Sequence, residues 1–385
     1  MNDLVPLRDA IQTLSRALEA EDFSGWDPYD ALASPLIAKV ARLGLLRQVG
    51  IQTVKALPMN VRPFLGVPKQ QHTKALALFV SAYSRLAAQP GGEHYRELAV
   101  GLGERLRGRA VSSGDGIGWG YDFDVQTRWG YYRRGQPNGV VTAFAAHALL
   151  DLAGVTGDDG LREPVEQMLA FARSELLVER AEGSFFSYVA GSKTPIHNAS
   201  LLVASVFARC NALDSDEVLS ARSAIEYSLG CQRPDGSWPY GEGVTLGWVD
   251  GYHTAYVLRT LAWCDGVAGS PPVREAVVSG LDLYLERLID PDGGPRSSLR
   301  FRYPLDIHAA ASAIWSLSEL RGYDERALPI AKRVLDWSLR SMRREDGRFA
   351  FQRRRLFRNS VPYVRWSDGH MLLALASYLR AVERS

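Results

Sequence analysis

Three aspartate–histidine pairs stand at corresponding places in the sequence, each at the start of an apolar stretch rich in small residues. The pairs are Asp250 with His253, Asp306 with His308, and Asp368 with His370. Histidine gains or loses a proton near neutral pH, so such a pair suits general acid–base catalysis. An aspartate at a helix start can be only a cap, which remains the alternative for Asp306 and Asp368. Capping does not require a histidine each time, so we expect at least two pairs to line a functional cavity.

Arginines and large aromatic residues gather in the same segments before the apolar stretches. A guanidinium group binds a carboxylate or phosphate in a two-point fork, and aromatic faces suit sugar rings or a polyprenyl chain. The candidate substrate-binding residues are Trp119, Asp124, Arg128, His197, Asn198, Trp248, Arg302, Arg365 and Trp366. Pairing of each arginine with a nearby aspartate, and packing of the rings into gaps, are the alternatives.

The totals exclude several other classes of protein. The 385 residues are 46% apolar and 23% charged with a formal net charge of +2, and no nucleic-acid-binding motif is present. No apolar run reaches the ~18 residues of a membrane span, and the first residues lack the apolar region of a secretory signal. We therefore expect a cytoplasmic protein with no integral membrane span and no nucleic-acid partner. Its expected partner is a small-molecule or oligosaccharide substrate, including one linked to a polyprenyl carrier.

The cysteines indicate neither a disulfide framework nor a metal knuckle. Cys210, Cys231 and Cys264 are widely spaced, and none falls among the aspartate–histidine pairs. Because aspartate and histidine can both bind zinc, a catalytic zinc ion is an alternative, but we assign no metal ligand and no cofactor. The sequence also lacks a Walker A motif, a G-x-S-x-G elbow, and a G-x-G-x-x-G motif after a strand.

A repeat of helices must position these residues. Apolar helices are predicted to begin near residues 72, 138, 198, 250, 306 and 368, with amphipathic helices around 93–108, 161–178, 215–231, 272–289 and 326–344. Five of the apolar helices follow an acidic-Gly turn with a short extended aromatic arm. These turns begin at Asp115, Glu182, Asp235, Asp292 and Asp346. Self-similarity at this period indicates stacked units that cannot bury their apolar faces alone.

Pairs of one apolar and one amphipathic helix close naturally into a two-layer ring with the apolar helices inside. Six pairs predict an all-α fold, an (α/α)6 toroid that forms a single domain over residues 34–385. Residues 1–33 are expected to form a short N-terminal helical extension, with a helix over 3–20 and an aromatic loop, and a further helix is expected over 34–46. Because the inner helices run parallel, their first residues should meet at one mouth of the central cavity.

Two segments resemble known toroid enzymes. Residues 232–238 (QRPDGSW) resemble the Q…DGSW repeat of squalene–hopene cyclases, and residues 250–256 (DGYHTAY) are similar to the zinc-histidine segment of protein prenyltransferase β-subunits. Both resemblances imply an α/α toroid. The Asp-x-Cys ligand pair of the prenyltransferases and the DxDD acid motif of the cyclases have no counterpart in this chain.

A second resemblance covers most of the chain. It rests on residues 26–32 (WDPYDAL), 119–128 (WGYDFDVQTR), 197–199 (HNA) and 248–254 (WVDGYHT). Together these segments resemble the VpsJ-like, or glucuronyl C5-epimerase-like, toroid proteins of bacterial polysaccharide loci. Six-hairpin carbohydrate enzymes, including N-acylglucosamine 2-epimerases with paired cavity histidines, share the implied architecture. The resemblance implies a role in polysaccharide assembly.

The leading hypothesis is an enzyme that acts on an anionic sugar or glycan during polysaccharide or glycoconjugate biosynthesis. Proton abstraction next to a carboxylate or carbonyl, giving epimerisation or β-elimination, needs a base and an acid on opposite faces of the sugar ring. The catalytic candidates are His253 and His308 as base and acid, Tyr252 as a substitute for either, Asp250 and Asp306 as orienting groups, and the pair Asp368 and His370. Arg128, Arg302 and Arg365 would hold the acidic group, and Trp119, Trp248 and Trp366 would stack on rings.

Three alternatives remain open. A glycoside hydrolase would use Asp250 or Asp306 as general acid and another aspartate as base. An isoprenoid enzyme, of the terpenoid cyclase or prenyltransferase type, would bind a polyprenyl chain in a deep aromatic cavity, whereas a carbohydrate enzyme predicts a cavity lined by Asp, His and Arg. The third alternative is a non-catalytic glycan-binding protein.

Overall fold

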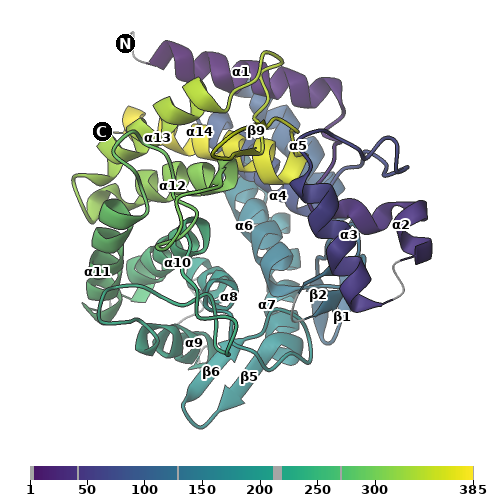
Figure 1. Cartoon of the computed structure of the whole chain (residues 1–385). Helices are drawn as coiled ribbons and strands as arrows, with labels where there is room; N and C mark the ends of the chain where they lie inside the picture. Colours follow the sequence, from purple (N-terminus) through teal and green to yellow (C-terminus); the bar gives the residue numbers. More distant parts are fainter. Residues whose placement is uncertain (1–3, 41–42, 128–129, 211–218, 269–270, 385) are drawn as a thin grey trace.

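The chain folds into an (α/α)6 toroid, as predicted. The computed structural model describes residues 4–40, 43–127, 130–210, 219–268 and 271–384. The inner layer consists of α4 (Thr73–Ala87), α6 (Gly139–Thr156), α8 (His197–Arg209), α10 (Gly251–Ala268), α12 (Ile307–Glu319) and α14 (His370–Glu383). The outer layer includes α5 (Glu93–Arg107), α7 (Glu163–Phe171), α9 (Leu219–Gly230), α11 (Pro271–Arg287) and α13 (Ala327–Ser341). Each inner helix contacts the next around the ring, and α14 contacts α4 to close it (Figure 1).

The inner helices are buried nearly all round, which explains their composition. In the part of the chain that the structure describes, α6 is the helix long and apolar enough to cross a membrane, yet 67% of that stretch is buried inside the fold. It packs between α4 and α8 and is therefore a core helix of the ring. The outer helices bury one face only: α13 buries Ile330, Val334 and Trp337 and exposes polar side chains on its other side.

The acidic-Gly turns pack against the outer helices. Gly236 and Gly293 have φ values of +84° and +91°, a left-handed conformation that favours glycine. A Cβ atom on Gly236 would lie 2.6 Å from the carbonyl oxygen of Ser279 on α11, and one on Gly293 would lie 2.3 Å from that of Arg333 on α13. These turns therefore need glycine both for backbone conformation and for close approach to the helix.

Helix α1 (Val5–Ala20) takes the outer position beside the last inner helix. It packs against α14, and its buried side chains Leu7, Ile11 and Leu14 belong to the same core as those of the ring. A Cβ atom on Gly347 would lie 3.0 Å from the Cβ of Thr13 in α1, so this turn packs on α1 just as the equivalent turns pack on α11 and α13. The ring is thus completed by a helix from the opposite end of the sequence.

The remaining elements are short. In place of the helix expected over 34–46, the structure has α2 (Pro35–Val40) and α3 (Gly44–Ala56). Short helical turns are η2 (Asp30–Ala33), η3 (Asp159–Leu161), η4 (Ala172–Leu176), η6 (Leu320–Gly322) and η7 (Val364–Gly369). The strands are β1 (Val111–Ser113), β2 (Gly116–Gly118), β3 (Val125–Gln126), β4 (Tyr131–Tyr132), β5 (Leu177–Arg180), β6 (Gly183–Phe186), β7 (Leu305–Asp306), β8 (Gln352–Arg353) and β9 (Arg358–Asn359).

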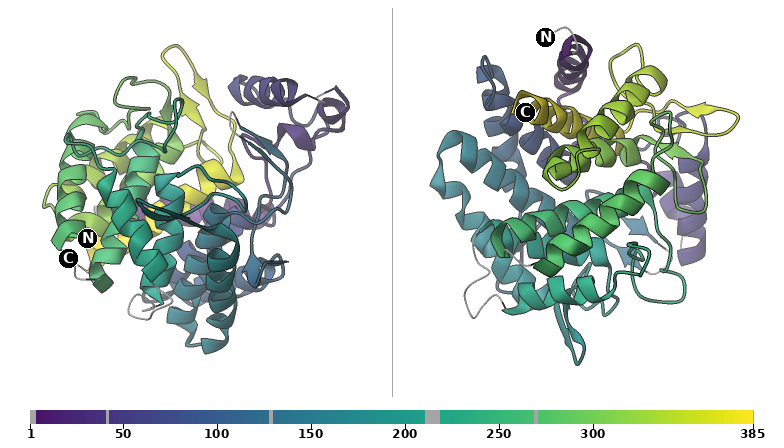
Figure 2. Two further views of the ribbon diagram at one scale, coloured as in Figure 1. Left: turned by 90° about the horizontal axis from the view of Figure 1, so that it is seen from below. Right: turned by 90° about the vertical axis from the view of Figure 1, so that its left-hand side faces the viewer.

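All strand pairs are antiparallel: β1–β2, β3–β4 and β5–β6 form hairpins, and β7–β8–β9 form a three-stranded sheet. In that sheet Asp306 is paired with Gln352, which matters for the site below. Figure 2 (left) shows α3 and the loops before the inner helices on the same side of the ring.

Candidate active site

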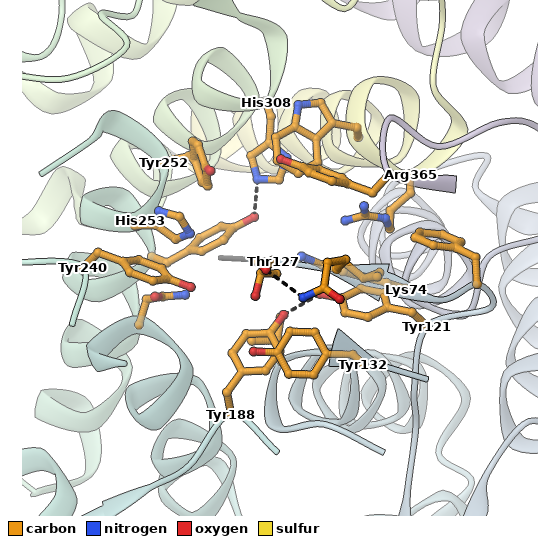
Figure 3. Close-up of a pocket in the computed structure, with 18 of the residues that line it drawn as sticks. Lys74, Tyr121, Thr127, Tyr132, Tyr188, Tyr240, Tyr252, His253, His308 and Arg365 are labelled. Carbon is orange, nitrogen blue, oxygen red and sulfur yellow. Dashed lines mark hydrogen bonds between the residues drawn. The ribbon is translucent and has the colours of Figure 1, made fainter. Parts of the chain in front are cut away.

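A cavity of about 420 Å³ opens at the mouth of the ring where the inner helices begin. The first turns of these helices, with η7, contribute Lys74, Val140, Asn198, Tyr252, His253, His308, Arg365 and Trp366 to its wall. Helix α3 adds Gln48 and Gln52 from the outside. The predicted convergence of the helix starts is therefore confirmed. Figure 3 shows His253 and Tyr240 on one side of the cavity and Lys74 and Arg365 on the opposite side.

Asp250 and His253 form a dyad at the cavity wall. The carboxylate Oδ2 of Asp250 accepts a hydrogen bond from His253 Nδ1 at 2.7 Å, and its Oδ1 accepts from the His253 backbone N–H at 2.8 Å. With the proton held on Nδ1, Nε2 of the neutral ring keeps a lone pair. The imidazole packs among the rings of Tyr240 and Tyr252, with centroid distances of 4.5 and 4.1 Å. This arrangement is that of a general base oriented by a carboxylate.

The other two histidines are joined through a tyrosine instead. Tyr256 Oη lies 2.6 Å from His308 Nε2 and 3.0 Å from His370 Nε2, and His370 Nδ1 donates to the Arg365 carbonyl at 2.7 Å. His370 Nε2 must then accept the Tyr256 proton, and His308 Nε2 donates to the Tyr256 oxygen. Burial lowers the pKa of both histidines well below the ordinary value. Both are therefore neutral, as this series of hydrogen bonds requires.

Neither Asp306, which was expected to act as an orienting group, nor Asp368 hydrogen-bonds to the ring of its paired histidine. Asp306 caps α12 through the backbone N–H of His308, and its oxygens accept from Gln352 Nε2 at 2.6 Å and Trp366 Nε1 at 2.8 Å. Burial raises the Asp306 pKa against these hydrogen bonds. Asp368 accepts from Arg348 Nε at 2.8 Å. The expectation that Asp306 orients His308 was wrong, because β7–β8 pairing directs the carboxylate to Gln352.

Lys74 is a functional candidate that sequence reasoning missed. It is 4% exposed and lines the cavity from α4, with its Nζ 4.1 Å from the centroid of the Phe144 ring. Among the described residues, no carboxylate pairs with its ammonium group and no hydrogen bond reaches it. Burial, reinforced by Arg365, lowers the pKa of Lys74 well below its ordinary value. A lysine inside an otherwise apolar helix was the signal for it.

Arg365 reaches the cavity wall as expected, but with an unexpected partner. Its Nε and Nη2 donate to the two carboxylate oxygens of Asp27 at 2.6 and 2.8 Å. Neither Asp368, three residues along the chain, nor any other nearby aspartate takes this role. The charge of Arg365 is thereby balanced, so among the described lining residues the amine of Lys74 is left to meet an anionic ligand at this side of the cavity.

Only some of the remaining predicted substrate residues lie at the cavity. Asn198, Trp248 and Trp366 line the cavity, whereas Arg128 lies outside the described residues. The others lie elsewhere: Trp119 is buried and donates to the Leu106 carbonyl, Asp124 accepts from Tyr131 and from the Arg134 backbone, and Arg302 pairs with Asp290 and Asp292, while His197 faces Cys231 and Glu242. The structure therefore does not bring Trp119, Asp124, Arg302 or His197 to the wall of this cavity, and each has contacts of its own elsewhere.

Tyrosines dominate the rest of the wall. The seven are Tyr29, Tyr121, Tyr132, Tyr188, Tyr240, Tyr252 and Tyr256. The hydroxyls of Tyr121 and Tyr188 hydrogen-bond to each other at 2.7 Å. No aspartate or glutamate is among the described residues that line the cavity. Within the same described ranges, the aspartate–histidine pairs form no group of three metal ligands. The cavity is therefore aromatic, but hydroxyls, amides, imidazoles and cations make it polar.

Solved structures with this fold include sugar epimerases, isomerases and glycoside hydrolases. Cellobiose 2-epimerase from Bacillus thermoamylovorans matches over 83% of this chain and 90% of its own, with a TM-score of 0.64 and 13% identity. A UGL variant with dGlcA-Glc-Rha-Glc matches over 98% of this chain and 96% of its own, with a TM-score of 0.67 and 15% identity. An unsaturated glucuronyl hydrolase specific for heparin matches over 81% of this chain and 87% of its own, with a TM-score of 0.60 and 12% identity.

No family model and no curated protein sequence matches the chain. At identities of 9–15% the structural similarity shows the (α/α)6 toroid, while the assignment of a reaction has to come from the cavity itself.

Proposed function

We propose that the protein is a carbohydrate-active enzyme that removes a proton next to the carboxylate of a uronic acid unit in an anionic glycan. The observation that carries this proposal is the arrangement of the cavity: the Asp250–His253 dyad faces, across the cavity, the buried amine of Lys74, which binding of an anion would protonate. A base and a cation on opposite sides suit a sugar held by its carboxylate with the adjacent C–H bond directed at the base.

The reaction follows from these groups. His253 Nε2 takes the proton from the carbon next to the carboxylate, and Asp250 stabilises the imidazolium that forms. The electron pair of the broken C–H bond moves into the carboxylate, where Lys74 stabilises the enolate charge. Return of a proton to the opposite face gives the epimer, and expulsion of a leaving group at the next carbon gives an unsaturated product. Tyr256 is the proposed proton donor: it would give the sugar the proton that it otherwise donates to His370, and its phenolate would keep the hydrogen bond from His308.

Two further observations support this choice. Hydrolysis by two carboxylates would need an acidic pair in the cavity, and none of the described lining residues is acidic. The similar structures include a sugar epimerase and a glucuronyl hydrolase, so this fold accommodates both sugar epimerisation and uronic acid substrates. The hydroxyl and amide groups on the wall favour a sugar over an isoprenoid chain.

The exposed side of α3 supports a substrate carried on a polyprenyl anchor. Leu45, Leu46 and Val49 are 71, 48 and 53% exposed, while Gln48 and Gln52 of the same helix line the cavity. An apolar anchor could lie along this face while its sugar enters the mouth. This predicts a higher kcat/KM for a lipid-linked glycan than for a free glycan, and a smaller difference in Leu45→Gln. Equal kcat/KM for the two glycans in the wild type would contradict it.

Hydrogen exchange tests the proposed reaction. We expect incubation of the protein with uronic acid glycans in heavy water to give deuterium at the carbon next to the carboxylate, detected by mass spectrometry and NMR. An eliminating enzyme would instead produce an unsaturated sugar with new ultraviolet absorbance. Absence of both products for glycans that bind to the protein would overturn the proposal.

A further inference from the structure

Three metal-ligating side chains converge away from the catalytic dyad. His197, Cys231 and Glu242 each offer one ligand atom, and these atoms all lie within 4.8 Å of one another. They come from three different segments: the start of α8, the residue after α9, and the loop before α10. None of the three lines the central cavity, although their neighbours Asn198 and Tyr240 do.

The backbone holds two of these residues side by side. An isolated antiparallel bridge pairs Ile196 with Gly241, each of which directly precedes one of the candidate ligands. The His197 N–H donates to the Tyr240 carbonyl at 3.2 Å, and the Glu242 N–H donates to the Pro195 carbonyl at 3.1 Å. Main-chain hydrogen bonds therefore hold the backbones of His197 and Glu242 near each other, and side-chain rotamers set the distance between their ligand atoms.

The histidine is buried without a partner. His197 is 1% exposed, and its Nε2 has no hydrogen-bond partner in the described part of the chain. Burial lowers its pKa to about 4, although the charge of Glu242 opposes this shift. A buried, neutral imidazole nitrogen with no hydrogen bond is unfavourable, and coordination to a metal ion is one arrangement that would satisfy it.

We propose that His197, Cys231 and Glu242 bind a divalent transition metal ion of the zinc class. Imidazole, thiolate and carboxylate are the ligand types that Zn²⁺ takes in proteins, at about 2.0–2.3 Å from the metal. Ligand atoms bound at those lengths stand roughly 3.3–3.8 Å apart, so side-chain movements on the order of 1 Å would complete the site. Glu242 is 36% exposed, which leaves the remaining position open to water.

The groups around Glu242 fit a ligand carboxylate. Tyr227 donates to Glu242 Oε1 at 2.5 Å, and Arg180 lies 3.6 Å from Oε2. Such outer contacts orient a carboxylate that binds a metal. Without metal, the Cys231 thiol also points at Oε1, at 3.6 Å. Metal binding to Cys231 must release the thiol proton, so it weakens as the pH falls.

The site would tie three successive segments together. A metal held there would link the end of α9 to the starts of α8 and α10, the two inner helices whose first residues carry Asn198 and the Asp250–His253 dyad to the cavity. Its role is structural, and it does not depend on the proposed reaction.

Cobalt substitution tests the site directly. Protein treated with a chelator and titrated with Co²⁺ should show the near-ultraviolet thiolate-to-cobalt band at one equivalent. Cys231→Ser should lose this band and Glu242→Gln should weaken it. Cys210→Ser, which removes the other half-buried thiol, should keep it. No band in the wild type, or a band that requires Cys210, would overturn the proposal.

A second measurement needs no variant. Zn²⁺ should slow alkylation of Cys231 in the wild-type protein by at least about tenfold, because a coordinated thiolate is withheld from the reagent, while Cys210 reacts at an unchanged rate. Peptide mapping by mass spectrometry distinguishes the two. Equal rates at Cys231 with and without zinc would contradict the assignment.

Discussion

Arg365 and Asp27 form a buried two-point ion pair between segments that lie at opposite ends of the sequence. Both guanidinium–carboxylate distances, 2.6 and 2.8 Å, are short, and Asp27 is fully buried. Because Arg365 also lines the cavity, the pair joins the N-terminal aromatic segment to the cavity wall. A second buried pair, Arg62 with Asp30 at 2.6 Å, lies beside it.

Breaking this pair should destabilise the protein strongly. Asp27→Asn leaves the Arg365 charge buried without its partner, which should lower the free energy of unfolding by about 3–5 kcal/mol. Although burial opposes ionisation, Arg365 holds the Asp27 pKa below its ordinary value, so this stabilisation should be lost as the pH falls through the acid range. Urea unfolding measures both effects. Asp336→Asn, at an exposed ion pair on α13, is the control and should cost less than about 1 kcal/mol.

The dyad should control the rate of hydrogen exchange. His253→Ala should reduce deuterium incorporation into an accepted glycan by about 10²–10⁴-fold, because it removes the general base. Asp250→Asn should act in the same direction, because the amide cannot stabilise the imidazolium. His94→Ala, at an exposed histidine of α5, should leave the rate unchanged. A wild-type rate in His253→Ala would remove the assigned base.

Lys74 should decide affinity for acidic sugars. Lys74→Met should weaken binding of glucuronate by at least about tenfold, since the carboxylate loses its one unpaired cation, and leave glucose binding almost unchanged. Because burial lowers the Lys74 pKa, binding of an anion should favour protonation of the amine. Calorimetry in buffers of different ionisation enthalpy should therefore show proton uptake in the wild type. Similar uptake and affinity in Lys74→Met would contradict this role; Lys332→Met serves as the control.

Acid should unfold the protein through its buried histidines. Burial lowers the pKa of His72, His147, His197, His308 and His370. These residues bind protons near pH 6.5 only when unfolded, so stability should fall as the pH drops below that value. Each histidine contributes about 1.4 kcal/mol per pH unit to the slope. His147→Asn should reduce the slope of unfolding free energy against pH by about that amount, whereas an unchanged slope would refute the explanation.

Substitutions at two glycines should distinguish the cost of a strained backbone conformation from the cost of a steric clash. Gly236 and Gly191 both have positive φ, +84° and +77°. A Cβ atom on Gly236 would lie 2.6 Å from the Ser279 carbonyl oxygen, whereas a Cβ atom on Gly191 would have no neighbour within 4 Å. Gly191→Ala should cost about 1 kcal/mol, and Gly236→Ala roughly 1–3 kcal/mol more. Urea unfolding would show equal losses if the turn did not pack on α11.

The fold was largely predictable because its determinants are local and repeated. Apolar helices, acidic-Gly turns and amphipathic helices recur in order, and the helix starts expected near 138, 198 and 306 are found at Gly139, His197 and Ile307. The partner of the last inner helix was less evident. Nothing in the composition of α1 reveals that it packs on α14, because that pairing depends on closure of the ring.

The site was predictable only in part, for a physical reason. The Asp250–His253 pair is local, since three residues on a helix share a face, and the structure shows the expected hydrogen bond. The Arg365–Asp27 pair, in contrast, joins residues distant in sequence. Lys74 was missed because it belongs to a helix read as uniformly apolar, although it is the one lysine in that helix.

Closure of the ring by α1 also determines when the apolar face of this helix is covered during translation. Among the helices of the ring, α1 is synthesised before the others and packs against α14, which is synthesised after them. Its apolar side chains, such as Leu7, Ile11 and Leu14, therefore lack their native partner through most of translation. Until α14 emerges, the nascent chain exposes an uncovered amphipathic helix, the kind of apolar surface that favours aggregation.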